Sequence, residues 1–109
     1  MSLNTSELAM NMLNAAKEVL SEKWPDIKDY AESETKKLAE SFVMIEKLKL
    51  VGKIDQEQAR LHFEIQKNAT RTVLLTSQGL GILVVEQALN AAFSVVKDTV
   101  NTALDFALL

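Results

Sequence analysis

The stretch KLVGKIDQEQ, residues 49–58, contains the clearest turn signal in the chain and lies near its midpoint. Gly52 can adopt the left-handed backbone conformation that commonly ends a helix. Asp55, followed three residues later by Gln58, resembles a capping box that opens the next helix. These residues predict that one helical segment ends near Gly52, that another begins just after Asp55, and that the chain reverses direction between them.

The segment before this turn carries apolar residues on a seven-residue pattern, which is typical of an amphipathic helix. One column contains Met10, Trp24, Ala31, Leu38 and Ile45, and the other contains Leu13, Leu20, Ile27 and Leu48. Pro25 interrupts the segment, because proline kinks or breaks a helix interior but is tolerated in a first turn. The columns keep the same phase on both sides of Pro25, which favours a kink over a separate second helix.

A similar stripe follows the turn and continues to residue 109. One column contains Ile65, Thr72, Gly79, Glu86, Phe93, Val100 and Ala107, and the other contains Leu61, Asn68, Leu75, Ile82, Leu89, Val96 and Ala103. Gly79 and Gly81 mark the place where a helix over this segment would bend or break, because glycine is a poor helix former. The repeat therefore predicts helix on both sides of these glycines.

Pro25 and Gly79 are equally far from Gly52 along the sequence, so two architectures fit the pattern. In the first, a long antiparallel hairpin bends at both points and pairs with another copy to cover its apolar seam. In the second, the chain breaks at both points and forms an up-down bundle of three or four helices, which buries its own core. Both are all-α, and both treat residues 1–109 as one domain.

The composition narrows the fold class and the function. Three Gly and one Pro in 109 residues provide little turn-forming material, which disfavours a fold rich in β-strands. The net charge of −3 gives no basic surface for a phosphate backbone, so nucleic acid is not expected as a partner. The absence of cysteine excludes disulfides and thiolate chemistry. The opening MSLNTSELAM lacks the features of a secretory signal, and we expect a cytoplasmic protein.

Residues 72–96 carry one formal charge, Glu86, and this length raises the question of a membrane span. Eight polar side chains interrupt the segment: Thr72, Thr76, Ser77, Gln78, Glu86, Gln87, Asn90 and Ser94. A central glutamate adds a free-energy cost on insertion. The pattern therefore favours a helix buried by other helices, although it does not exclude a membrane role.

Glu86 interrupts the apolar column of the second half, and an unpaired carboxylate at a packed seam would be unfavourable. In a hairpin that turns at Gly52, Lys17 would stand close to Glu86 and interrupts the first stripe at the matching place. We therefore expect a buried ion pair between Lys17 and Glu86. The alternative is that Glu86 acts as a ligand or proton-handling group, since perturbed carboxylates are enriched at functional sites.

Signatures of catalysis and metal binding are missing from the sequence. The single histidine, His62, follows Ala59 at the spacing where a di-iron bundle places Glu, so a site of that kind fails within one chain. A symmetric dimer would have Glu34, Glu46, His62 and Glu64 as its nearest candidates. No Gly-x-Ser-x-Gly elbow and no phosphate-binding loop occur. We expect no enzymatic activity, no catalytic residue and no cofactor.

The pattern as a whole favours a small helical interaction or structural protein that forms a homodimer or tetramer through residues 72–109, and possible partners include another helical protein. The expected interface and core positions are Leu75, Ile82, Glu86, Leu89, Phe93, Val96 and Val100. One alternative is a membrane-surface or membrane-inserting protein whose C-terminal helix is released by lipid. Another is a helical bundle that binds a metal or small molecule through Glu86.

Overall fold

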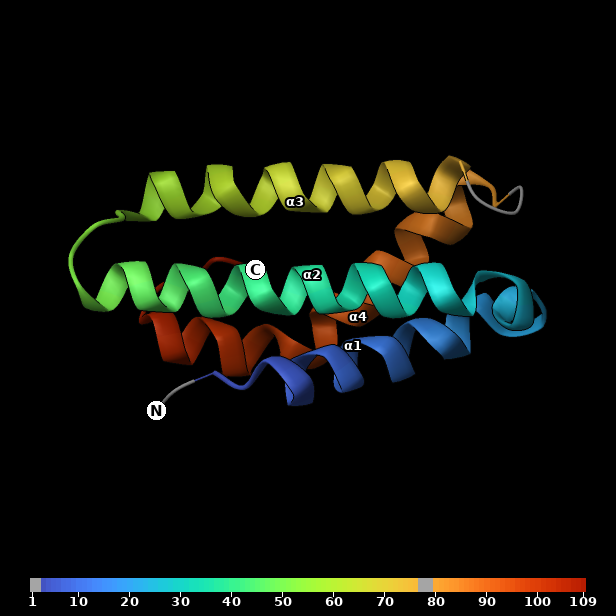
Figure 1. The fold of residues 1–109 in the computed structure, drawn as a ribbon, viewed down its shortest axis with the longest axis horizontal. Coiled ribbons are helices and arrows are strands. Elements are labelled where there is room, and N and C mark those ends of the chain that lie inside the picture. Colours follow the sequence, from blue (N-terminus) through green and yellow to red (C-terminus); the bar gives the residue numbers. More distant parts are fainter. Residues whose placement is uncertain (1–2, 77–79) are drawn as a thin grey trace.

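The computed structural model describes residues 3–76 and 80–109. Over these ranges the chain forms helices α1 (Thr5–Leu20), α2 (Trp24–Leu50), α3 (Gln56–Thr76) and α4 (Ile82–Leu104), with a short 3₁₀ helix, η1 (Ser21–Lys23), between the first two. Successive α-helices run in opposite directions (Figure 1), and neither described range contains a β-strand. The all-α prediction is confirmed, and the architecture is the up-down bundle rather than the long hairpin.

The four helices are packed unevenly within a bundle that measures 43 × 22 × 19 Å. α4 crosses behind α2 and packs most extensively on α1, while α3 rests mainly on α2 and contacts α4 less (Figure 1). This arrangement leaves α3 along one edge of the bundle. One long side of α3 therefore faces away from the other helices.

The first reversal of the chain occurs at Ser21, several residues before Pro25. Ser21 has φ 47°, and its N–H donates to the carbonyl of Lys17, which ends α1. Pro25 then lies in the first turn of α2, where its missing N–H and fixed φ are tolerated. The expectation of a kinked continuous helix was wrong, because the columns keep their phase even though the chain turns back between them.

The turn at Gly52 is confirmed in detail. Gly52 has φ 71°, and the N–H of Lys53 donates to the carbonyl of Leu48 across 2.8 Å, so the last carbonyls of α2 are satisfied. At the start of α3, the N–H of Gln58 donates to Asp55 Oδ1 at 2.8 Å, and the N–H of Asp55 donates to Gln58 Oε1 at 3.0 Å. The capping box predicted from two residue types therefore forms with both reciprocal hydrogen bonds.

The second predicted weak point also separates two helices. α3 ends at Thr76, and Gly81 is the extended residue before α4, with φ −78° and ψ 157°. Gly79 lies outside the described residues. Across the described ranges, no helix joins the length and the hydropathy that crossing a bilayer requires.

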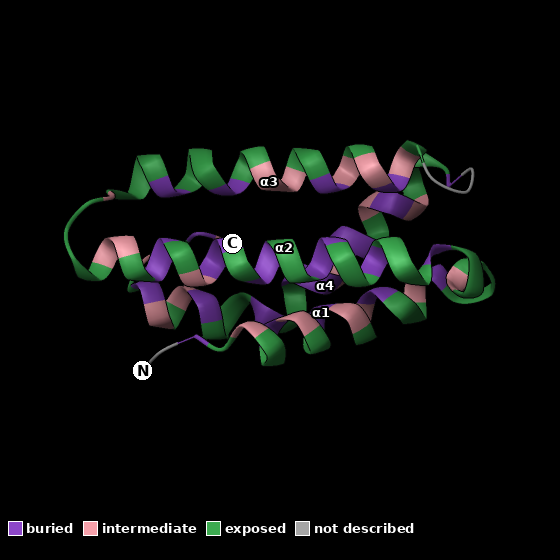
Figure 2. Cartoon of the chain, in the orientation of Figure 1, coloured by how far each residue is buried: buried purple, intermediate pink, exposed green. Residues whose placement is uncertain are grey.

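Three phenylalanines from three helices form an aromatic cluster within the core. Phe42 of α2 stacks on Phe63 of α3 with ring centroids 5.4 Å apart, and Phe93 of α4 meets Phe63 edge-on at 5.2 Å. Such aromatic pairs add about 0.5 to 1.5 kcal/mol each beyond the burial of their surface. Buried residues run along the inner side of every helix (Figure 2), so this cluster joins α2, α3 and α4 into one packed unit.

Both described ends of the chain are tied back to the bundle by polar side chains. The buried Glu46 accepts a hydrogen bond from the N–H of Leu3 at 2.9 Å, which holds the segment before α1 against α2. Asp105, with φ 61°, ends α4, and Asn101 Oδ1 then accepts from the N–H groups of Leu108 and Leu109 at 2.9 and 3.0 Å. The residues after α4 are thereby folded over its last turns.

Candidate functional site

Glu86 is paired with an arginine from the neighbouring helix. Arg71 of α3 donates from Nε to Glu86 Oε2 at 2.7 Å and from Nη2 to Oε1 at 3.0 Å, so the pair is bidentate. Arg71 Nη1 also donates to Asn68 Oδ1 at 2.6 Å. The Glu86 side chain is 39% exposed and that of Arg71 is 24% exposed, so the pair lies at the boundary of the bundle rather than in its core.

The predicted ion pair between Lys17 and Glu86 was therefore wrong, both in its partner and in its burial. The Lys17 ammonium instead lies over the ring of Trp24, 5.6 Å from its centroid. The prediction assumed two long helices standing side by side. Because the chain breaks before Pro25 and again before α4, Glu86 comes next to the helix that directly precedes it in the sequence, where Arg71 lies.

The arginine also fixes the ionisation state of Glu86. Hydrogen bonding from Arg71 lowers the pKa of the Glu86 carboxyl below its ordinary value, and the charge of Lys67 lowers it further. The same hydrogen bonds raise the pKa of the Arg71 guanidinium. Glu86 is thus held as a carboxylate with both oxygens engaged, an arrangement that suits a positioning role better than proton transfer.

The residues predicted as an apolar interface on α4 lie mostly inside this chain's own core. Leu89, Phe93, Val96 and Val100 are buried, whereas Leu75 and Glu86 are half-buried and Ile82 is 55% exposed. The stripe on α4 was correctly identified as a packing surface. Helices of the same chain cover it, however, so these four buried residues are not free to contact a second copy.

On α3, the residues of the same seven-residue pattern face away from the core rather than into it. The core side of this helix presents Ala59, Phe63, Thr70 and Leu74. The two pattern columns instead form a line of positions that faces outward or lies at the boundary, which we call the α3 seam: Gln58, Leu61, Ile65, Asn68, Thr72 and Leu75.

Leu61 is 60% exposed and Ile65 is 72% exposed, and the outer edge of α3 is solvent-exposed over much of its length (Figure 2). Sequence reasoning listed these positions but missed that they form a second, outward stripe. The available signal was that Ala59, Phe63 and Leu74 already define a separate apolar side of the same helix.

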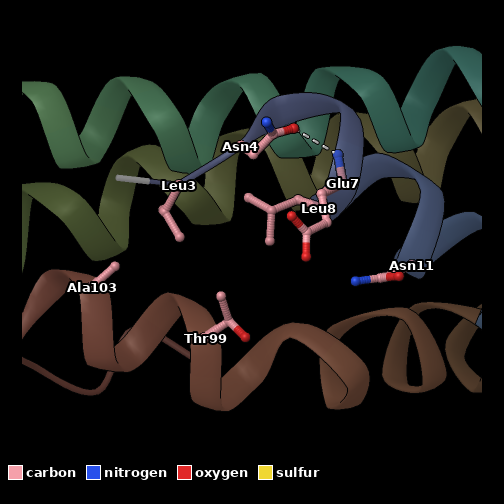
Figure 3. A pocket seen from close by; sticks show the side chains of 7 residues that line it. All are labelled: Leu3, Asn4, Glu7, Leu8, Asn11, Thr99 and Ala103. Carbon is pink, nitrogen blue, oxygen red and sulfur yellow. Dashed lines mark hydrogen bonds between the residues drawn. The ribbon is translucent and has the colours of Figure 1, made fainter. Parts of the chain in front are cut away.

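A cavity of about 260 Å³ lies between α1 and α4, where Glu7, Asn11 and Thr99 surround an aliphatic floor that includes Leu8 (Figure 3). Asn4 also borders it, but its Oδ1 accepts the hydrogen bond from the N–H of Glu7 that caps α1. The cavity could hold a small molecule that donates hydrogen bonds to Glu7. Its volume is below the range of about 300 to 1,000 Å³ typical of ligand pockets, and its polar groups are exposed.

The residues named as metal candidates are dispersed over the bundle. Glu34 is buried and pairs with Lys37 at 3.1 Å, and the buried Glu46 holds the N–H of Leu3. His62 and Glu64 lie on the exposed side of α3. Within residues 3–76 and 80–109, no group of three or more histidine, aspartate or glutamate side chains is placed to hold a metal ion.

Of the surfaces described, the α3 seam is the one whose residue types, exposure and spacing together point to a role. No protein-family model, curated protein or solved structure matches the chain, so the geometry of this seam is the basis for assigning a function.

Proposed function

We propose that this chain is a small, non-catalytic helical protein that self-associates in the cytoplasm. The observation that carries the proposal is the α3 seam, an uncharged line that is exposed from Gln58 to Thr72 and reaches the core only at Leu75, on a helix whose opposite side is already packed in the core. The spacing of the seam alternates between three and four residues, as in helices that pair side by side. The sequence analysis predicted self-association through residues 72–109. Of that segment, only Thr72 and Leu75 belong to the α3 seam.

The contrast with α2 supports this assignment. The exposed side of α2 carries charges of both signs, including Lys28, Glu32, Lys36 and Glu40, as expected for a helix that faces water. The α3 seam holds none over six positions. Exposed Leu61 and Ile65 lie on this uncharged line, although the exposed Glu57, Arg60 and Glu64 lie beside it, and they gain free energy when another apolar surface removes them from water.

The absence of cysteine is compatible with a reducing compartment, where disulfides would not persist. Self-association through paired helices would also give a protein of 109 residues a larger surface on which further partners could bind.

Molar mass measured by light scattering across a dilution series tests the proposal. We expect a defined oligomer, at least twice the 12.1 kDa of one chain, that dissociates on dilution. A mass of one chain up to millimolar concentration would contradict self-association. Circular dichroism at each concentration controls for changes in helix content.

A further inference from the structure

A groove of about 350 Å³ lies between α3 and α4, and Leu108 and Leu109 of the segment after α4 also line it. Its volume lies within the range of about 300 to 1,000 Å³ that is typical of ligand pockets. The apolar part of its lining includes the buried Phe63 of α3, the buried Phe93 of α4 and the buried Leu108. The groove therefore combines residues of two helices and the end segment over a base that belongs to the core.

Hydrogen bonds within the chain connect α3 to the opposite wall on either side of the groove. Arg71 and Glu86 join α3 to α4 through their bidentate pair. Arg60 Nη2 donates to the carbonyl of Ala107 at 3.2 Å and so joins α3 to the segment after α4. The α3 residues that line the groove lie between these two arginines in the sequence. Both ends of the groove are therefore set by contacts that the fold itself makes.

Two lysines line the groove, one from each helix. The Lys67 ammonium of α3 lies over the ring of Phe93, 5.7 Å from its centroid, so its charge is held next to the apolar lining. Lys97 of α4 is exposed, and over residues 3–76 and 80–109 it forms no ion pair, either with an acidic side chain or with the end of the chain. Glu64 is the one acidic side chain of the lining. The lining side chains thus favour an anionic ligand, although the chain as a whole carries a net charge of −3.

The α4 wall adds two neutral hydrogen-bonding groups. Asn90 and Ser94 lie four residues apart, so they are neighbours on one side of the helix. In the part of the chain that the structure describes, neither side chain has a hydrogen-bond partner. An amide NH₂ group and a hydroxyl group can both donate to a carboxylate oxygen. The lining therefore offers ammonium, amide and hydroxyl donors beside an apolar surface.

We infer that the groove between α3 and α4 binds a small organic acid in which one carboxylate is joined to an apolar body. The carboxylate accepts charge-assisted hydrogen bonds from Lys67 and Lys97, and such bonds are stronger than those between neutral groups. The apolar body packs toward Phe93 and Leu108, where it leaves water. This inference does not depend on self-association, because the groove lies on the side of α3 that faces α4 and the α3 seam does not line it.

Three probes separate the charge of the ligand from its apolar body. Octanoate carries both, octan-1-ol carries the body alone, and acetate carries little more than the carboxylate. The isotope-labelled full chain is titrated with each probe at neutral pH, and backbone amide chemical shifts are followed by NMR. We expect saturable shifts with octanoate at Lys67, Asn90, Phe93 and Ser94, and an affinity at least about tenfold weaker for each of the other two probes.

A charge-removing variant tests the role of the lysines. Lys97→Met keeps an apolar stem at an exposed position, so the bundle should remain folded, and its amide spectrum checks this. We expect the dissociation constant for octanoate to rise at least about fivefold, while the weak binding of octan-1-ol stays unchanged. Lys36→Met, on the exposed side of α2, is the matched control and should leave the affinity for octanoate unchanged.

Several results would overturn the inference. These are the absence of saturable shifts at millimolar octanoate, an equal affinity for octan-1-ol or acetate, and an unchanged affinity in Lys97→Met. Shifts that map instead to Asn11 and Thr99, in the cavity between α1 and α4, would also overturn it. Light scattering keeps the two proposals distinguishable, because a chain that binds octanoate in the groove but stays monomeric contradicts self-association alone.

Discussion

Both carboxylate oxygens of Glu86 accept hydrogen bonds from Arg71, at 2.7 Å from Nε and 3.0 Å from Nη2, and these contacts connect the first turns of α4 to α3. Glu86 is the residue that interrupts the apolar stripe of α4, and its pair lies at the edge of the bundle. A polar residue within an apolar pattern is thus satisfied by a neighbour fifteen residues away in the chain.

The pH dependence of stability should reveal this pair. Because the pKa of Glu86 is lowered in the folded chain, its contribution is fully present above the unfolded carboxyl pKa and is lost as the pH falls through the folded value. Since Glu86 is partly exposed, Glu86→Gln should reduce the free energy of unfolding by about 0.5 to 1 kcal/mol at pH 7. The difference should shrink as the pH falls below the unfolded carboxyl pKa, as measured by urea denaturation at one protein concentration.

Glu32→Gln is the matched control for this measurement, because Glu32 forms only a 4.0 Å contact with Lys28 on the exposed side of α2. We expect its unfolding free energy to stay within about 0.3 kcal/mol of the natural chain at both pH values. An equal loss in the two variants would argue against a specific Arg71 contribution.

The aromatic cluster should dominate stability. Phe42 is fully buried between the rings of Phe63 and Phe93, so Phe42→Ala removes aromatic contacts and leaves a cavity. We expect the free energy of unfolding to fall by about 3 to 5 kcal/mol in urea denaturation. Leu83→Ala on the surface, where Leu83 is 68% exposed, should cost less than about 0.5 kcal/mol.

The turn after α2 should depend on its glycine. Gly52 has φ 71° and a Cβ at this position would meet no atom within 4 Å, so the cost of Gly52→Ala is conformational rather than steric with neighbours. We expect a loss of about 1 kcal/mol in thermal or urea unfolding. Gly81→Ala is the comparison, since Gly81 has φ −78° and open space, and its effect should stay within about 0.5 kcal/mol.

Self-association should be lost when charge is placed on the α3 seam. Ile65→Glu places a carboxylate in the middle of the α3 seam, and the position is 72% exposed, so the bundle should remain folded. We expect the dissociation constant of the dimer to rise at least about tenfold, equivalent to 1.4 kcal/mol, as measured by analytical ultracentrifugation. Met10→Glu on α1, where Met10 is 60% exposed, should leave the constant unchanged.

Local signals explain why parts of the fold could be predicted. Gly52, Asp55 and Gln58 form the turn through contacts among close neighbours, and the sequence contains all of that information. The reversal at Ser21 has no such local signal, because serine rarely adopts a positive φ and the apolar phase continues across it. The partner of Glu86 depended on that reversal. Because the predicted topology missed it, Lys17 rather than Arg71 was predicted as the partner.

The seven-residue pattern alone also could not predict whether an apolar stripe faces the core or the solvent. Leu89 and Leu61 belong to the same seven-residue column, yet Leu89 is buried and Leu61 is 60% exposed. Helix α3 has apolar residues on two sides, and only the packing of the whole bundle decides which side faces the core. Periodicity thus identified helices and candidate surfaces, while tertiary packing assigned them to the interior or the exterior.

Helix α3 packs mainly on α2, and this uneven packing affects local unfolding of the molecule. A helix held chiefly from one side opens at a lower free energy than a central one, so its amide protons should exchange with solvent faster than those of α4. A second copy lying along its free side would suppress that opening. Helix order and assembly would then be thermodynamically linked, and a cell could adjust the local folding of α3 through the abundance of the protein itself.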